Sequence, residues 1–168
     1  MIMRVMYITS YQTPRKTRPD WIIVHYTGCE GNAEQICRSM ARKKSDIKRC
    51  ASTNYIIDET GEIIHAVNES RYYAWHCATA GILTYCGANN ANSIGIDLCT
   101  HKDKAGAWII SGMALRSAAI LIAELMRRYD INIAHVVRHY DVTHKRCPRP
   151  LVDEKAWADF KKIIIESS

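Results

Sequence analysis

The sequence predicts a single α/β domain, spanning residues 21–168, in which a mixed central β-sheet is flanked by helices. Two observations carry this prediction. Short β-branched apolar runs alternate with longer segments whose apolar residues recur at helical spacing, and two of the short runs are joined by a turn typical of a hairpin. The 168 residues, without internal repeats or low-complexity segments, suffice for one domain with a buried core.

The first part of the chain contains a leader, a strand, a helix and the hairpin. Residues 1–20 are expected to form a leader segment, packed on or near the domain, because a short apolar stretch is followed by PRKTRP with its two prolines. The run WIIVHY at 21–26 predicts a buried strand. Asn32 can cap a helix that continues to about residue 44. The runs TNYIID and EIIHAV, within 53–67, predict the hairpin.

The second part adds strands and helices in alternation. SIGIDLC at 93–99 predicts a strand, and the loop-like GANNAN precedes it. Ser111 is a suitable cap for a long helix that ends near Tyr129, because the apolar residues between them recur at helical spacing. IAHVV at 133–137 predicts the last strand, and Asp153 can cap the last helix.

The charge, the binding motifs and the hydropathy of the chain bear on the class of its partner. The net charge of +6 favours an anionic partner, which could be nucleic acid, a membrane surface or a cell-wall polymer. No nucleic-acid binding is expected, because the chain has neither an aromatic–basic stripe nor a known binding motif. No stable membrane insertion is expected either, because the longest apolar run, AAILIAELM, is interrupted by Glu124 and followed by two arginines.

The N-terminus and the cysteines bear on the cellular compartment. The first residues lack the order of basic and apolar residues that a secretory signal has, so the chain is expected to be made in the cytoplasm. Seven cysteines occur without a CxxC pair, which argues against a zinc ribbon or a thioredoxin-type motif. Most of them are expected to be reduced and buried. None of these features predicts an oligomeric state.

Three residues near strand ends are candidate metal ligands. His25 ends the first predicted strand, His139 follows the last one, and Cys147 comes eight residues later across a loop. Two imidazoles and a thiolate are good zinc ligands, and three protein ligands leave a fourth position for water, as a catalytic zinc site requires. Without the other two residues, the simpler interpretation of His25 is a hydrogen-bonded core histidine. His76 and His144 are further candidate ligands.

Four motifs together resemble a known family. They are WIIVHYTG, AWHCATAG, NSIGIDL and RHYDVTHKRCPRP, in this order. They resemble the zinc-dependent N-acetylmuramoyl-L-alanine amidases, which include phage lysozyme-type amidases, muropeptide-recycling amidases and peptidoglycan recognition proteins. The resemblance covers residues 21–160. It implies the fold of that family, hydrolysis of the amide between N-acetylmuramic acid and L-Ala of the stem peptide, and one Zn²⁺ ion bound by His25, His139 and Cys147.

The resemblance implies roles for three further residues. Lys145 occupies the position of a catalytic lysine, where a cation steadies the developing oxyanion. His76 matches a histidine that lines the substrate groove. Asp97 stands where recycling amidases carry a glutamate, so we expect it to act as general base and acid. The alternative for Asp97 is a carboxylate that holds a ligand histidine in place.

Two residues of the predicted hairpin are candidates for substrate binding. Lysozyme-type members carry a tyrosine where this chain has Thr53, whose hydroxyl can form hydrogen bonds but cannot replace a phenol. Tyr55 is expected on the same strand face, although a half-buried structural tyrosine is the simpler interpretation. The subgroup stays open, because Cys147 resembles the lysozyme type whereas Asp97 resembles the recycling type.

The leading interpretation is a peptidoglycan hydrolase, either a phage endolysin or a bacterial wall-lytic enzyme. Without a signal peptide, such an enzyme would reach the wall through a holin or another route. One alternative is a cytosolic recycling amidase that acts on soluble muropeptides. Another is a non-catalytic peptidoglycan-binding module, which the presence of Cys147 disfavours.

Overall fold

A six-stranded mixed sheet forms the centre of the molecule. The computed structural model describes residues 2–42, 51–79 and 84–168. The strand order is β1-β5-β4-β7-β3-β10, in which β4 and β5 are antiparallel and all other neighbours are parallel. This arrangement confirms the predicted α/β class and the hairpin. The strands are β1 (Met3–Val5), β3 (Trp21–Tyr26), β4 (Tyr55–Ile57), β5 (Ile63–His65), β7 (Ser93–Leu98) and β10 (Val136–Arg138).

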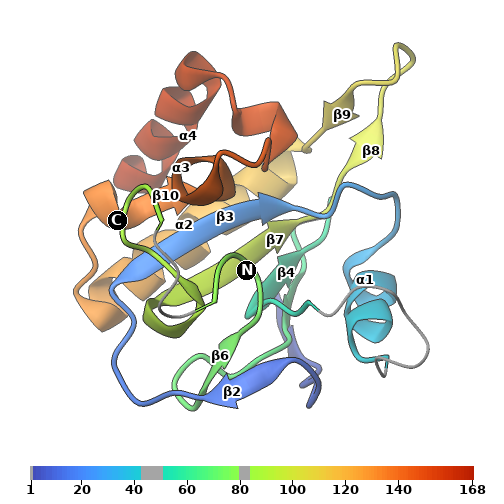
Figure 1. The fold of residues 1–168 in the computed structure, drawn as a ribbon. Helices are drawn as coiled ribbons and strands as arrows, with labels where there is room; N and C mark the ends of the chain where they lie inside the picture. The colour runs from blue at the N-terminus through green and yellow to red at the C-terminus, as the bar shows by residue number, and fades with distance from the viewer. Residues whose placement is uncertain (1, 43–50, 80–83) are drawn as a thin grey trace.

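Helices pack on both faces of this sheet (Figure 1). Alternate side chains of the strands, such as Val24 and Ile96, form a core with α2 and α4. On the opposite face, Ile56 and Ile64 pack against Ile36 of α1. The alternate residues of β3 and β7 point to the sheet face opposite α2 and α4, where they can contribute to a site. The helices are α1 (Ala33–Met40), α2 (Gly112–Tyr129), α3 (His139–Thr143) and α4 (Glu154–Glu166).

The three predicted helix caps are confirmed. The side chains of Asn32, Ser111 and Asp153 each accept a hydrogen bond from the backbone N–H three residues later. The first helix ends at Met40, short of the predicted end near residue 44, and residues 43–50 lie outside the described part of the chain. Within the described residues, no helix is long and apolar enough to cross a membrane.

The segment before Trp21 contributes strands to the fold. Parallel pairing with β5 makes β1 an edge of the central sheet, and β2 (Gln12–Pro14) pairs with β6 (Tyr72–Ala74). The guanidinium of Arg15 donates to the carbonyls of Glu69, Ala91 and Ser93 at 2.6–2.8 Å. These bonds attach the segment to the start of β7. A domain boundary at residue 20 stays a prediction.

The prediction of a strand at 133–137 is wrong in its first half. Residues Ile133–His135 form a 3₁₀ turn, and the strand begins at Val136. The Asn132 side chain accepts a hydrogen bond from the Ala134 backbone N–H, which stabilises a turn instead of a ladder. His135 in turn stacks on Trp21 with ring centroids 4.0 Å apart. Local capping and stacking therefore override the β-branched composition.

A short hairpin completes the described fold. β8 (His101–Lys102) and β9 (Trp108–Ile109) are antiparallel and project from the body of the molecule in Figure 1. Between β10 and Cys147, the expected loop is partly helical, since α3 begins at His139. The Arg138 backbone N–H donates to the Asp141 carboxylate at 2.8 Å, which caps this helix.

Candidate metal centre and active site

The three predicted metal ligands lie together. His25 is near the end of β3, and its neighbour strand β10 leads directly into His139. The His25 Nδ1 atom is 3.1 Å from His139 Nδ1 and 3.7 Å from Cys147 Sγ. All three ligand atoms lie within 4.8 Å of one another, and all three residues are buried. Residues separated by more than a hundred positions thus form one cluster.

The spacing of these atoms can be compared with that around a metal ion. In tetrahedral zinc sites the Zn–N and Zn–S distances are about 2.0–2.1 and 2.3 Å, which places two nitrogens about 3.3 Å apart and a nitrogen and a sulfur about 3.6 Å apart. The separations of 3.1 Å and 3.7 Å are close to both values. The donor set and these two separations therefore fit a metal ion with three protein ligands.

Arg138 holds the segment that carries two of the ligands. Its guanidinium is buried and donates to the carboxylates of Asp141 and Glu154, each at 2.7 Å. It also donates to the carbonyl of Val152 at 2.9 Å. The Tyr140 backbone N–H donates to the carbonyl of Cys147 at 2.8 Å and closes the loop. His139, at the start of α3, and Cys147, beyond its end, are thereby held at a fixed separation.

His76 lies directly beside the cluster. Its Nδ1 atom is 2.9 Å from Nε2 of His25, and its Nε2 atom is 3.1 Å from the hydroxyl of Ser93. The ring packs over β7 at Gly95, where a Cβ atom would lie only 2.7 Å from His76 Cγ. Burial, followed by the charge of His139, lowers the pKa of His76 to about 3. His76 is therefore a neutral neighbour of the candidate ligand His25.

Asp97 and Lys145 line the same pocket as the cluster. This pocket has a volume of about 380 Å³ and is bordered by His25, His76 and Cys147 as well. Asp97 is paired in register with His25 on the adjacent parallel strand, so both side chains project from the same face of the sheet. Lys145 is exposed and approaches the pocket from the loop before Cys147. A carboxylate and an ammonium group thus share one cavity with two of the candidate ligands, His25 and Cys147.

Thr53 and Tyr55 have other surroundings. Neither belongs to the described residues that line this pocket. Tyr55 is 2% exposed and stacks on His65 with centroids 4.5 Å apart. Burial, followed by the charge of Glu69, raises the pKa of Tyr55. Thr53 is fully buried two residues before β4 begins. Roles for both in substrate binding stay predictions from the sequence.

Four supporting residues were not anticipated from the sequence. Arg138 supports the ligand loop, Ser93 contacts His76, and the Asn90 side chain accepts hydrogen bonds from the backbone N–H groups of His76 and Cys77. Gly95 gives space to the His76 ring. A glycine inside a buried strand often marks a place where another group approaches the backbone closely. Gly95 was therefore a signal in the sequence for the packing of the His76 ring on β7.

Comparison with known proteins places the chain in a family. Residues 15–150 match the family model for N-acetylmuramoyl-L-alanine amidases. The chain belongs to this family. The match confirms the resemblance that the four motifs indicated. The amidase CwlL of Bacillus licheniformis is 32% identical over 153 residues, which are 84% of this chain and 39% of CwlL. A probable N-acetylmuramoyl-L-alanine amidase of the same organism is 35% identical over 119 residues, 68% of this chain and 32% of its own length.

Solved structures have the same fold as this amidase-family chain. PlyL has a TM-score of 0.80 at 23% identity and covers 100% of this chain and 99% of its own. The catalytic domain of XlyA has a TM-score of 0.71 at 26% identity and covers 96% of this chain and 99% of its own. The chain spans only about a third to two fifths of the two curated relatives, whereas it matches nearly the whole length of these structures.

Proposed function

We propose that this chain is a zinc-dependent peptidoglycan amidase that cleaves the amide between N-acetylmuramic acid and L-Ala of the stem peptide. The observation that carries the proposal is the buried His25–His139–Cys147 cluster, two members of which, His25 and Cys147, line a pocket that is also lined by Asp97 and Lys145. Membership of the amidase family supports the choice of bond. Two imidazoles and one thiolate support the choice of zinc.

Each polar residue of the pocket has a part in this proposal. When bound, Zn²⁺ would supply a Lewis acid and allow water to act as a nucleophile near neutral pH. Asp97 would take a proton from the attacking water and deliver it to the leaving nitrogen of L-Ala. Lys145 would place its positive charge beside the oxygen on which negative charge develops. The exposed position of Lys145 allows its flexible side chain to reach a bound substrate.

Lytic action on the cell wall is the cellular role that we favour. The net charge of +6 suits an anionic wall polymer. An endolysin of Bacillus subtilis, solved as a mutant, has a TM-score of 0.77 at 25% identity to this chain. Release through a holin or another route independent of a signal peptide belongs to this proposal. A recycling amidase is the second candidate, because Asp97 stands where amidases of that subgroup carry a glutamate.

The reaction can be tested on purified peptidoglycan. Digestion should release stem peptides that begin with a free L-Ala amine, which mass spectrometry detects. Chelation of the metal should abolish this release, and added Zn²⁺ should restore it, because the metal activates the nucleophile. Products cut at another bond, or cleavage that chelation does not affect, would contradict the proposal. Parallel digestion of soluble anhydro-muropeptides separates the recycling role from the lytic one.

The ligand set can be tested with Cys147→Ser. A serine hydroxyl stays protonated near neutral pH and is a poor zinc ligand, so bound zinc and hydrolysis should be lost together. Metal content of the purified protein measures the first effect and peptide release the second. Cys86→Ser is a suitable control, because Cys86 is half-buried in a cluster with Ala88 and Val142 and does not border the pocket. Full zinc occupancy in Cys147→Ser would refute the assignment.

A further inference from the structure

A chain of hydrogen bonds leads from the backbone to the candidate ligand His25. The Ser93 hydroxyl donates to the carbonyl of Asn89. The same hydroxyl lies 3.1 Å from Nε2 of His76, whose Nδ1 lies 2.9 Å from Nε2 of His25. The opposite nitrogen of His25, Nδ1, is the one that approaches His139 and Cys147. Each imidazole therefore uses its two nitrogens in different directions.

The direction of each hydrogen bond follows from one fixed end. A carbonyl oxygen can only accept, so the single proton of the Ser93 hydroxyl is used toward Asn89. Toward His76 this hydroxyl can then only accept, which requires a proton on His76 Nε2. A neutral imidazole has one N–H, so His76 Nδ1 carries a lone pair and accepts from Nε2 of His25. The same reasoning leaves His25 Nδ1 with a lone pair that points to the ligand cluster.

The position of His76 is itself strongly constrained. Its backbone N–H donates to the Asn90 side chain at 3.0 Å, and its ring lies over Gly95, where even a methyl group would clash. The rings of His25 and His76 are perpendicular, with centroids 5.1 Å apart. In this arrangement His76 can hardly tilt without breaking contact with His25 or Ser93. Both ring nitrogens have partners, so the hydrogen-bonding capacity of the ring is directed to the protein.

We propose that His76 is a positioning residue that fixes His25 in the Nε2–H tautomer and aims its Nδ1 lone pair at the metal. This inference rests on the proposed function in one respect, since it takes His25 as a metal ligand. It assigns to His76 a task that differs from lining a substrate groove. Partners of this kind orient ligand histidines and raise their basicity, and their loss typically weakens metal binding by about 10- to 100-fold.

Replacement of His76 tests the positioning role through zinc affinity. His76→Ala removes the acceptor and should weaken zinc binding about 10- to 100-fold in competition with a chromogenic chelator. His76→Asn keeps an acceptor, because its Oδ1 occupies the place of the imidazole Nδ1, and should recover most of the affinity. His101→Ala, on the exposed β8 strand, should bind zinc as the unchanged chain does. Equal affinities of the unchanged chain and His76→Ala would overturn the proposal.

The tautomer of His25 gives a test that needs neither metal nor a variant. In the metal-free protein with ¹⁵N-labelled histidine, the ring nitrogen shifts should show His25 protonated at Nε2 and unprotonated at Nδ1. A proton on Nδ1 would overturn the proposal even if every variant failed to fold. Failure of the proposed function would be visible separately, as zinc binding by the unchanged chain no tighter than that of Cys147→Ser. The NMR result would still decide the role of His76 in that case.

Discussion

Asp97 is the residue on which the proposed proton transfer depends. It lies opposite His25 in the register of β3 and β7 and is about 9% exposed, at the wall of the pocket. A carboxylate in this place can accept a proton from water and pass it on, whereas an amide of the same shape cannot. The side chain is one methylene shorter than glutamate, so its reach depends on the position of the strand itself.

Asp97→Asn should separate proton transfer from metal binding. Zinc content should stay unchanged, because the ligand set is intact, while the turnover of peptidoglycan should fall about 10²-fold or more, the usual scale for a general acid–base group. Release of L-Ala-terminated peptides per unit time measures the effect. Asp159→Asn, on the exposed face of α4, is the matched control and should leave turnover unchanged. A near-normal rate in Asp97→Asn would return Asp97 to a structural role.

Single residues differ in how far the sequence predicts them. His25, His139 and Cys147 could be grouped because the two histidines end or follow apolar strands, the cysteine comes eight residues after the second histidine, and all three have the chemistry of a ligand. The bond between His76 and His25 could not be predicted, because it depends on how the 3₁₀ turn at Asn90–Asn92 brings the segment after β6 over β7. For Tyr55, the alternation of side chains along a strand predicts which face of the sheet it lies on. It does not predict which part of the chain covers that face, so the burial of Tyr55 could not be predicted.

At the scale of elements, β7 forms the floor under His76. Its residues alternate between the α2–α4 core and the site, and Ser93, Gly95 and Asp97 all face the site. Each has a distinct task there. Ser93 contacts His76, Gly95 makes room for its ring, and Asp97 borders the pocket. One strand of six residues thus supports both the candidate ligand His25 and the proposed proton carrier.

Gly95→Ala should disturb the site through packing alone. The new Cβ would lie 2.7 Å from Cγ and 2.9 Å from Nδ1 of His76, so the ring would have to move away from His25. We expect a loss of about 1–3 kcal/mol in the free energy of unfolding, the usual cost of overpacking, together with weaker zinc binding. Denaturant unfolding and chelator competition measure the two effects.

Gly112→Ala is the control for this change. At the first position of α2 a Cβ would meet its nearest neighbour only at 4.0 Å, so stability should stay the same or rise by up to about 1 kcal/mol. If Gly95→Ala were as stable as Gly112→Ala and bound zinc equally well, the close packing of His76 on β7 would not matter for the site.

Elements were predictable where capping residues and periodicity agree. The helices after Ser111 and Asp153 begin where predicted, because side-chain caps act locally. The strands β1 and β2 were missed for a different reason. They are three residues each, too short for a periodic pattern, and they form only because β5 and β6 offer partners distant in the sequence. Such pairing depends on the tertiary structure, so the segment before Trp21 could only be described as a leader.

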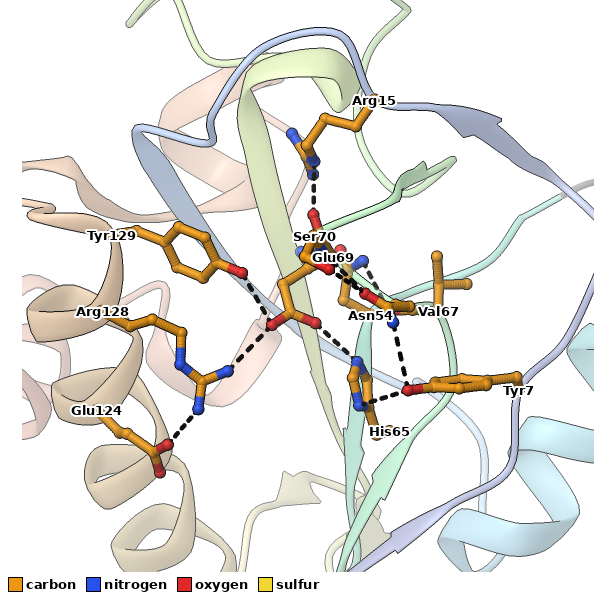
Figure 2. A network of polar contacts seen from close by, with 12 residues as sticks. Tyr7, Arg15, Asn54, His65, Val67, Glu69, Ser70, Glu124, Arg128 and Tyr129 are labelled. Carbon is orange, nitrogen blue, oxygen red and sulfur yellow. Dashed lines mark hydrogen bonds and ion pairs between the residues drawn. The ribbon is translucent and has the colours of Figure 1, made fainter.

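At the scale of the whole molecule, a buried carboxylate connects parts that lie far apart in the chain. Glu69 is 2% exposed and accepts hydrogen bonds from His65 at 2.7 Å and Tyr129 at 3.1 Å, while Arg128 approaches at 3.3 Å (Figure 2). Its backbone carbonyl accepts from Arg15. The hairpin, the C-terminal end of α2 and the segment before β3 therefore meet at this one residue.

The ionisation of Glu69 should make folding stability depend on pH. Burial alone would raise the pKa of Glu69, but the hydrogen bond from His65 and the charge of that residue outweigh it and lower the pKa to about 2, from an ordinary value of 4.5. A carboxyl group whose pKa is lower in the folded than in the unfolded state stabilises the folded state at pH values above its unfolded-state pKa. This contribution to the free energy of unfolding is lost as the pH falls through the folded-state pKa. The difference corresponds to at most about 3 kcal/mol, lost between about pH 4.5 and 2.

Glu69→Gln removes this titration and allows the contribution to be measured. The unchanged chain should exceed the variant in free energy of unfolding at pH 5, and the difference should shrink by up to about 3 kcal/mol as the pH falls to about 2. Denaturant unfolding of the metal-free proteins at each pH gives the two curves without a contribution from metal release. Glu166→Gln, at the exposed end of α4, should follow the unchanged chain at every pH. The two free energies of unfolding could instead differ by a constant amount over this pH interval. That result would mean that folding does not favour the ionised carboxylate, and that packing and uncharged hydrogen bonds hold these segments together.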